Sequence, residues 1–174
     1  KKRSNYIIYA GRISKEKGIE ELILSFKKAN LVNIKLKIVG DGPELNHLKS
    51  KYENEKILFT GIKSNEETIK EIRSALAVVT TTKLFEGQPT LLCEASSAGV
   101  PSIFPRSGGI DEFFPSNYKM SFEQFNYEDF EKKLLIVNDE LILKKLGEEN
   151  FNFISKYLKD EKLIANFKRV VDGG

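Results

Sequence analysis

The chain has 174 residues, of which 40% are hydrophobic, so it is long enough for one domain with a full core. Its net charge of +3, from 28 basic and 25 acidic residues, is too small an excess to argue for nucleic acid as a partner. No apolar run approaches the ~20 residues of a membrane span, and the single cysteine, Cys93, excludes an internal disulfide and suits a reducing compartment such as the cytoplasm.

The first residues are basic and carry no signal-peptide pattern. Lys1, Lys2 and Arg3 lead almost directly into a strand-like run, so we expect the sequence to be cut from a longer protein. The basic residues could form a linker or a peripheral contact with an acidic membrane face. A solvated basic end is the favoured alternative.

Strand-like and helix-like patterns follow one another along the chain. β-rich runs that stop at glycine or proline predict strands at 6–10, 34–39, 56–60 and 76–81, a short one ending at Phe104, and a sixth at 118–122. Helical spacing predicts helices at 19–29, from Pro43, at 65–74 and 89–98, from Tyr127, at 141–157 and at 161–171. Gly147 falls inside one of these helices, and we expect it to bend that helix.

This alternation predicts an α/β fold, a Rossmann-like parallel sheet with helices on both faces and extra C-terminal helices. The glycine-containing turns each follow a predicted strand. In open α/β sheets, ligands bind outside the carboxyl ends of the strands, where the strand order reverses. For the order 3-2-1-4-5, that crevice lies between strands one and four, with residues 11–18 on one side and 82–94 on the other.

Two carboxylates, Glu86 and Glu94, stand on the second side of this crevice. A strand, a turn containing Gly87 and the start of a helix form a site for an anion, while carboxylates accept hydrogen bonds from hydroxyl groups. Together these features fit a sugar nucleotide. Alternatively, Glu86 is a carboxylate that favours the helix start, and Glu94 is a solvent-facing helical residue. Because the helix is largely apolar, we expect Glu94 to be buried near a partner.

The first side of the crevice carries Gly11, Arg12 and Lys17. Arg12 can bind a diphosphate with two hydrogen bonds, and Lys17 can add a positive charge. The alternative is that both are ordinary surface charges. The residues match neither a P-loop nor the G-x-G-x-x-G motif of nicotinamide-binding proteins.

The sequence does not indicate a metal or another cofactor. One histidine, His47, and one cysteine cannot build a zinc site of the usual spacing, and we expect His47 to lie on the surface. No Asp-x-Asp pair is present to hold Mg²⁺ on a diphosphate. The segment from Gly61 to Lys63 closes a strand and could let backbone groups meet a flat base.

In their order and spacing, these motifs resemble the C-terminal, nucleotide-sugar-binding half of the retaining family 4, or group 1, glycosyltransferases of GT-B fold. The matching motifs are Tyr9-Ala10-Gly11-Arg12 with Glu16-Lys17-Gly18, Val39-Gly40-Asp41-Gly42-Pro43, Phe59-Thr60-Gly61, Phe85-Glu86-Gly87 with Pro89, Glu94-Ala95, Gly99-Val100-Pro101 and Gly108-Gly109-Ile110 with Glu112. Two positions depart from the family pattern. Lys83 replaces a small hydroxyl residue, and either contacts phosphate or points to solvent, while Ser96-Ser97-Ala98 replaces the usual Ala-Met-Ala.

The resemblance implies roles for individual residues. Arg12 and Lys17 would hold the donor diphosphate and stabilise it as the leaving group, and Glu86 would face the donor sugar. Glu94 would bind the ribose hydroxyls. The remaining donor-binding residues would be Gly11, Gly87, Leu91 and Leu92 near the diphosphate and Ile62 beside the base.

The resemblance also implies an activity. The family transfers a hexose from a nucleotide-diphosphate sugar to a glycan or glycolipid acceptor with retention of configuration and without a bound metal. We therefore expect a bacterial-type enzyme of lipopolysaccharide, capsule or other cell-surface polysaccharide synthesis, in the cytoplasm or at the cytoplasmic face of the inner membrane.

Residues 1–174 would form the single donor-binding domain, with the N-terminal acceptor domain absent, so the isolated chain should bind its donor weakly and transfer no sugar. A GT-B relative such as an epimerase or phosphorylase, or a non-catalytic nucleotide-binding module, remains the alternative.

Overall fold

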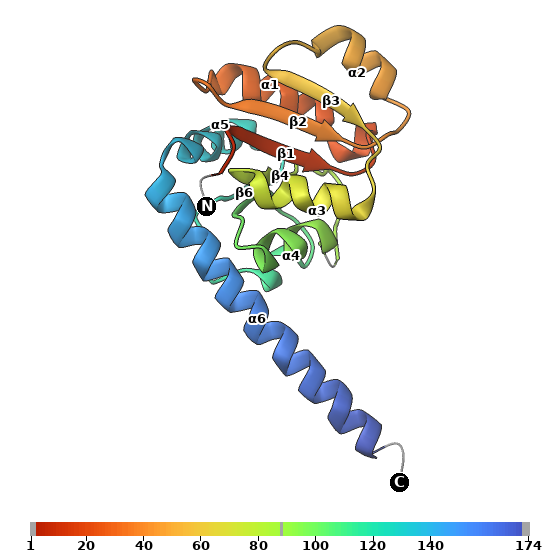
Figure 1. The fold of residues 1–174 in the computed structure, drawn as a ribbon, viewed down its shortest axis with the longest axis vertical. Helices are drawn as coiled ribbons and strands as arrows, with labels where there is room; N and C mark the ends of the chain where they lie inside the picture. The colour runs from red at the N-terminus through yellow and green to blue at the C-terminus, as the bar shows by residue number, and fades with distance from the viewer. Residues whose placement is uncertain (1–2, 88, 172–174) are drawn as a thin grey trace.

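The computed structural model describes residues 3–87 and 89–171, with side chains as far as residue 159 (Figure 1). Its centre is a six-stranded sheet in the order β3-β2-β1-β4-β5-β6, in which every neighbouring pair is parallel. The α/β, Rossmann-like prediction is confirmed, including the reversal of strand order between β1 and β4. The strands are β1 Tyr6–Ala10, β2 Lys35–Val39, β3 Ile57–Gly61, β4 Ala77–Val79, β5 Ser102–Arg106 and β6 Ser121–Glu123.

The central strands are buried on both faces. In β1, Ile7 and Ile8 pair with Ala77 and Val78 of β4, and all four side chains are fully buried. Continuous apolar runs of this kind are typical of parallel sheets that helices cover on both sides. The sequence therefore buries the middle of each strand and leaves the turns at the carboxyl ends exposed along one edge of the sheet.

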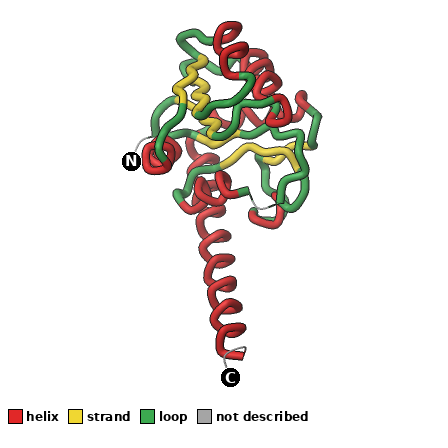
Figure 2. Tube along the Cα trace, turned by 90° about the vertical axis from the view of Figure 1, so that its right-hand side faces the viewer, coloured by secondary structure: helices red, strands yellow, loops and turns green. Residues whose placement is uncertain are grey.

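Two groups of helices cover the sheet (Figures 1 and 2). α1 packs against α5, whereas α4 packs against both α3 and α6. Because parallel crossovers are right-handed, the opposite steps from β1 to β2 and from β3 to β4 place α1 and α3 on opposite faces. The helices are α1 Ile19–Ala29, α2 Leu45–Tyr52, α3 Asn65–Ser74, α4 Thr90–Ser97, α5 Tyr127–Leu135 and α6 Glu140–Val171, with short 3₁₀ turns η1 Lys15–Lys17, η2 Ile110–Phe113 and η3 Ile136–Asn138.

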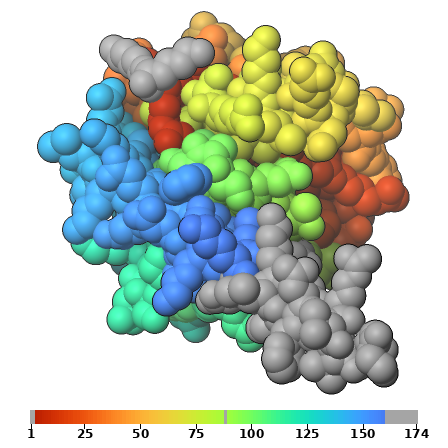
Figure 3. All heavy atoms as spheres, turned by 60° about the horizontal axis from the view of Figure 1, so that its bottom comes forward, coloured from red at the N-terminus to blue at the C-terminus, as the bar shows by residue number. Residues whose placement is uncertain are grey.

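The C-terminal region differs from its prediction. The two helices predicted at 141–157 and 161–171 are one helix, α6, which projects past the rest of the chain (Figures 1 and 2). Gly147 serves close packing in this helix, because a Cβ there would collide with the carbonyl oxygen of Gly99. Figure 3 shows α6, in blue, lying against the green segment that contains α4.

The N-terminal segment contacts the same loop at Gly99. Arg3 donates hydrogen bonds to the carbonyl oxygens of Ala75 and Gly99, and burial lowers the pKa of its guanidinium. The prediction of a solvated or membrane-contacting basic end is therefore wrong for Arg3, because these carbonyl groups hold it. Lys1 and Lys2 lie outside the described residues.

The predicted sixth strand begins later than expected, at Ser121 rather than residue 118. Tyr118 instead packs its ring against Phe104 and Phe114, and its hydroxyl accepts a hydrogen bond from the Ser102 N–H. Within the part of the chain that is described, no helix combines the length and hydropathy needed to cross a membrane.

Candidate functional site

A cleft of about 300 Å³ lies at the carboxyl ends of β1 and β4, where the strand order reverses. Residues from both predicted sides line it, among them Gly11, Arg12, Lys17, Glu86, Leu91 and Leu92. The topology thus brings together two segments that are about seventy residues apart in the sequence. The predicted position of the crevice is confirmed.

The two sides meet in an ion pair between Lys17 and Glu86. The Lys17 Nζ lies 2.6 Å from Glu86 Oε1, and the Thr82 hydroxyl donates to the same oxygen at 2.9 Å. Burial alone would raise the pKa of the Glu86 carboxyl, but the hydrogen bonds from Lys17 and Thr82 and the charge of Lys17 outweigh it, so this pKa lies below its usual range. Within the described chain, Glu86 Oε2 has no hydrogen-bond partner and can accept one from a ligand.

A turn after β5 fixes the backbone of Glu86. The Gly109 N–H donates to the Glu86 carbonyl oxygen at 3.0 Å. Gly108 has a φ of +61°, and a Cβ there would collide with that same carbonyl oxygen. Ser107 donates from its hydroxyl to the Leu84 carbonyl oxygen at 2.8 Å. Only glycine permits this close approach, so the turn orients the loop that carries Glu86.

Direct contacts also join the two sides behind the ion pair. The Thr81 hydroxyl donates to the Gly18 carbonyl oxygen at 2.7 Å, and the Lys83 N–H donates to the Glu16 carbonyl oxygen at 2.8 Å. These bonds hold η1, and with it Lys17, against the loop after β4. The cleft is therefore a preformed feature of the fold.

Arg12 has a different environment from Lys17. It is exposed, and its guanidinium forms no hydrogen bond or ion pair with the residues described. The Tyr9 hydroxyl donates to the Arg12 carbonyl oxygen at 2.7 Å, which fixes the backbone there. Burial, followed by the charges of Glu86 and Glu16, raises the pKa of Tyr9, so the phenol stays protonated as a donor. Arg12 thus borders the cleft with all its donors available.

Helix α4 opens onto the cleft. It begins at Thr90, one residue later than predicted, and no side chain caps its start. The first N–H groups of a helix have no partner within it, so those of Thr90 and its neighbours can meet an anion. Leu91 and Leu92 line the cleft beside them, whereas Gly87 lies in the exposed loop before the helix.

Glu94 lies one turn after Leu91, on the same face of α4. It is half-buried, and its carboxylate has no hydrogen bond or ion pair within the described residues. The expectation that Glu94 is buried near a partner is therefore wrong. Its side chain is partly exposed to solvent, and its oxygens are free of the described residues.

A second cleft, of about 500 Å³, adjoins the first and shares Gly11, Arg12 and Leu91 with it. Its other wall comes from the ends of β2 and β3 and from the start of α3. Ile62 belongs to this wall and is 75% exposed, an unusual position for a large apolar side chain. The pair of clefts forms one continuous groove along the carboxyl-end edge of the sheet.

Two polar residues singled out in the sequence, Lys83 and His47, lie away from the cleft. Lys83 is not among the residues that line the two clefts, and its Nζ forms an ion pair with Glu21 of α1 at 2.5 Å, which raises the pKa of Lys83. His47 is exposed on α2. The described residues contain no cluster of three or more His, Cys, Asp or Glu side chains suited to a metal ion.

Thr82, Tyr9 and Lys63 are site residues that the sequence patterns did not predict. Thr82 precedes Glu86 by four positions, and its hydroxyl also accepts from the Leu84 N–H at 3.2 Å. A hydroxyl residue directly after the strand predicted at 76–81 was the available signal. Tyr9 stands in the motif that ends at Arg12, and Lys63 ends the segment expected to meet a flat base, but only the three-dimensional structure shows their side-chain contacts.

Comparison with known proteins agrees with this architecture. Residues 1–153 match the family "Glycosyl transferases group 1". The chain is 24% identical over 173 residues to N-acetyl-alpha-D-glucosaminyl L-malate synthase of Bacillus anthracis, covering 94% of the chain and 44% of that protein. It is 29% identical over 155 residues to the capsular polysaccharide biosynthesis glycosyltransferase CapM of Staphylococcus aureus, covering 82% and 40%. The chain thus spans less than half the length of these relatives.

A solved structure shows the same fold. A mutant of TarM from Staphylococcus aureus, in a complex that includes UDP, superposes with a TM-score of 0.80 at 21% identity over 95% of the chain and 35% of TarM. The family match, which spans most of the chain, agrees with the strand order and with the motifs at the strand ends. The chain belongs to the group 1 glycosyltransferase family and has the Rossmann-like fold of a GT-B domain.

Proposed function

We propose that the chain is the donor-binding domain of a retaining glycosyltransferase that takes a hexose from a nucleoside diphosphate sugar. The observation that carries the proposal is the Lys17–Glu86 pair, set between a free guanidinium and the open start of α4. A single cleft then offers cationic and amide donors for a diphosphate and a carboxylate oxygen for a sugar hydroxyl.

The diphosphate would lie between Arg12, Lys17 and the start of α4. The Arg12 guanidinium has every donor free of the described residues, and the Lys17 ammonium uses one of its three donors on Glu86. Positive charge that is already in place stabilises the negative charge that develops as the diphosphate departs. We propose that these groups act without a bound metal or other cofactor.

The sugar would face Glu86, because Oε2 is available while Oε1 is held by Lys17 and Thr82. Glu94 has both carboxylate oxygens available one turn further along α4 and would accept the ribose hydroxyls. Gly11, Leu91 and Leu92 would line the diphosphate, with Gly87 at the helix entrance. The base would enter the second cleft beside Ile62.

The acceptor would be a glycan or a glycolipid, and we propose that a second domain of the full-length protein holds it. The name of CapM supports capsular polysaccharide synthesis. We further propose that the product is a cell-surface polysaccharide, lipopolysaccharide included, made in a bacterial cytoplasm or at the cytoplasmic face of the inner membrane. We accordingly propose that residues 1–174 bind the donor and that transfer needs both domains.

Ligand-dependent thermal unfolding tests this proposal. UDP, GDP or ADP, or one of their sugars, should raise the melting temperature, because a ligand that binds only the folded state stabilises it, by about 2.7 kcal/mol at a hundredfold excess over Kd. The shift should disappear in Arg12→Ala and persist in the control Arg73→Ala, which removes an exposed arginine of α3. If the shift survives in Arg12→Ala, or no nucleotide shifts even the full-length protein, the proposed site is wrong.

A further inference from the structure

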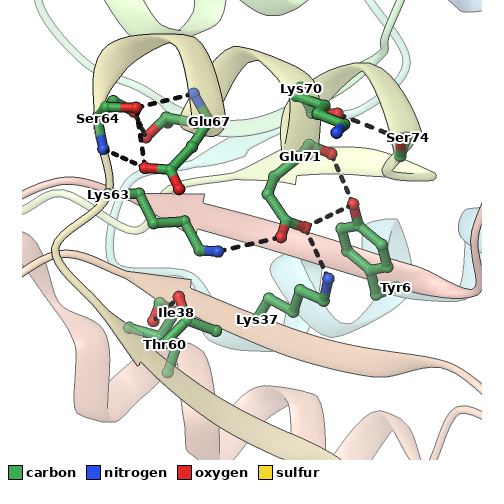
Figure 4. A network of polar contacts seen from close by, with 11 residues as sticks. Tyr6, Lys37, Ile38, Thr60, Lys63, Ser64, Glu67, Lys70, Glu71 and Ser74 are labelled. Atoms are coloured by element: carbon green, nitrogen blue, oxygen red, sulfur yellow. Dashed lines mark hydrogen bonds and ion pairs between the residues drawn. The ribbon is translucent and has the colours of Figure 1, made fainter.

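Two lysines share one carboxylate at the wall of the second cleft (Figure 4). Glu71 of α3 accepts from Lys37 at 2.6 Å and from the Tyr6 hydroxyl at 2.9 Å, both on Oε2. Its Oε1 faces Lys63 at the longer distance of 3.3 Å. Lys37 therefore neutralises most of the Glu71 charge. With Lys63 included, the cluster has two positive charges and one negative charge.

Lys63 is the member of this cluster that lines the cleft. Its side chain is 24% exposed, and its ammonium uses one of three N–H donors on Glu71. Two donors remain for a ligand, while Glu71 limits the positions that the flexible side chain samples. The carboxylate thus positions a charged hydrogen-bond donor without consuming it.

The cleft around Lys63 suits a flat ring. Ile62 offers an exposed apolar surface, and Asn65 contributes an amide at the start of α3. The charged residues of its wall are Arg12, Asp41 and Lys63, and one carboxylate oxygen of Asp41 accepts from the Gly42 N–H. Two cations against one carboxylate favour a ligand whose edge carries hydrogen-bond acceptors.

We propose that Lys63 recognises the carbonyl edge of the nucleotide base, so that the chain selects uridine or guanosine diphosphate sugars over adenosine and cytidine ones. This inference rests on the proposed function, which places the base in the second cleft. An ammonium donates only, so it pairs with O4 of uracil or O6 of guanine. Adenine and cytosine carry an amino group at the corresponding position, and two donors would then face each other.

Calorimetric titration of the full-length protein with UDP, GDP, ADP and CDP tests the inference. Wild type should bind UDP or GDP about tenfold more tightly than ADP and CDP, the difference expected for one hydrogen bond to a charged group. Lys63→Met should reduce this preference below about threefold, whereas Lys63→Arg, which keeps a charged donor, should retain most of it. Lys70→Met removes an exposed lysine of α3 and should change nothing.

The outcomes separate this inference from the function beneath it. Binding that requires Arg12 but keeps its base preference in Lys63→Met overturns the role of Lys63 alone, as does a wild-type preference for ADP or CDP. Failure of all four nucleotides to bind overturns the proposed function and the inference together. The thermal unfolding of each free variant shows whether Lys63→Met is folded, and Lys63→Arg keeps the test decisive if it is not.

Discussion

Two half-buried carboxylates, Glu86 and Glu71, have similar partners but different arrangements. Each binds a lysine at 2.6 Å and a hydroxyl group at 2.9 Å, and each has a carboxyl pKa below its usual range. In Glu86 both partners share one oxygen and the other is free of the described residues, whereas in Glu71 both oxygens are occupied. The difference indicates that Glu71 joins structural elements and that Glu86 is held ready for a ligand.

Glu86→Gln should have the largest effect and should act on chemistry. In the full-length protein, we expect sugar transfer to fall about 100-fold or more, because an electrostatic group in the cleft is lost, while nucleotide binding persists. Donor turnover and nucleotide-induced thermal shift measure the two effects. Glu66→Gln, an exposed residue of α3, is the control. Unchanged transfer would favour a non-catalytic nucleotide-binding module.

Glu71→Gln should instead act on stability. The substitution removes the negative charge that Lys37 and Lys63 share beside Tyr6. We therefore expect the free energy of unfolding to fall by about 1–2 kcal/mol. Urea denaturation measures the change, and Glu66→Gln should remain within about 0.5 kcal/mol of wild type. An unchanged free energy of unfolding in Glu71→Gln would show that these ion pairs do not stabilise the fold.

The smallest expected effect is on the pH dependence of stability, which depends on the carboxyl groups of both Glu86 and Glu71. Burial alone would raise the pKa of each carboxyl, but the hydrogen bonds from lysine and hydroxyl groups lower it by more than burial raises it. Both pKa values therefore lie below the ordinary Glu pKa of about 4.3. A lowered folded pKa adds stability above the unfolded pKa, and this stability is lost as pH falls through the folded pKa. Urea midpoints at about pH 7 and at about pH 4 should therefore differ less in either Gln variant than in wild type. An equal difference in all three would contradict the paired geometry.

The sheet and its binding edge were predictable because they depend on local patterns. Apolar runs ending at Gly11, Gly40 and Gly61 mark the strands, and chirality then sets which edges meet. The position of Arg12 opposite Glu86 follows from strand order alone. Residues on the same edge could thus be named before any distance was known.

Contacts between distant segments were not predictable in the same way. Lys83 pairs with Glu21, and the carbonyl oxygen of Glu86 is held by the turn at Gly108, which lies on another strand connection. Helical spacing predicted helices at 141–157 and at 161–171 but did not show that the two are one continuous helix, α6. The roles of the predicted site residues stay predictions until the variants are measured.

The crossing of α6 over Gly99 has a mechanical consequence. Gly147 leaves no room for a side chain between α6 and the loop at Gly99, so α6 would pivot about this contact. The helix continues from residue 147 to Val171, about 36 Å at 1.5 Å per residue. A tilt of about 5° at this contact would displace the far end by ~3 Å, so a small movement of α4, which packs against α6 and starts at the cleft, would become larger at the end of α6.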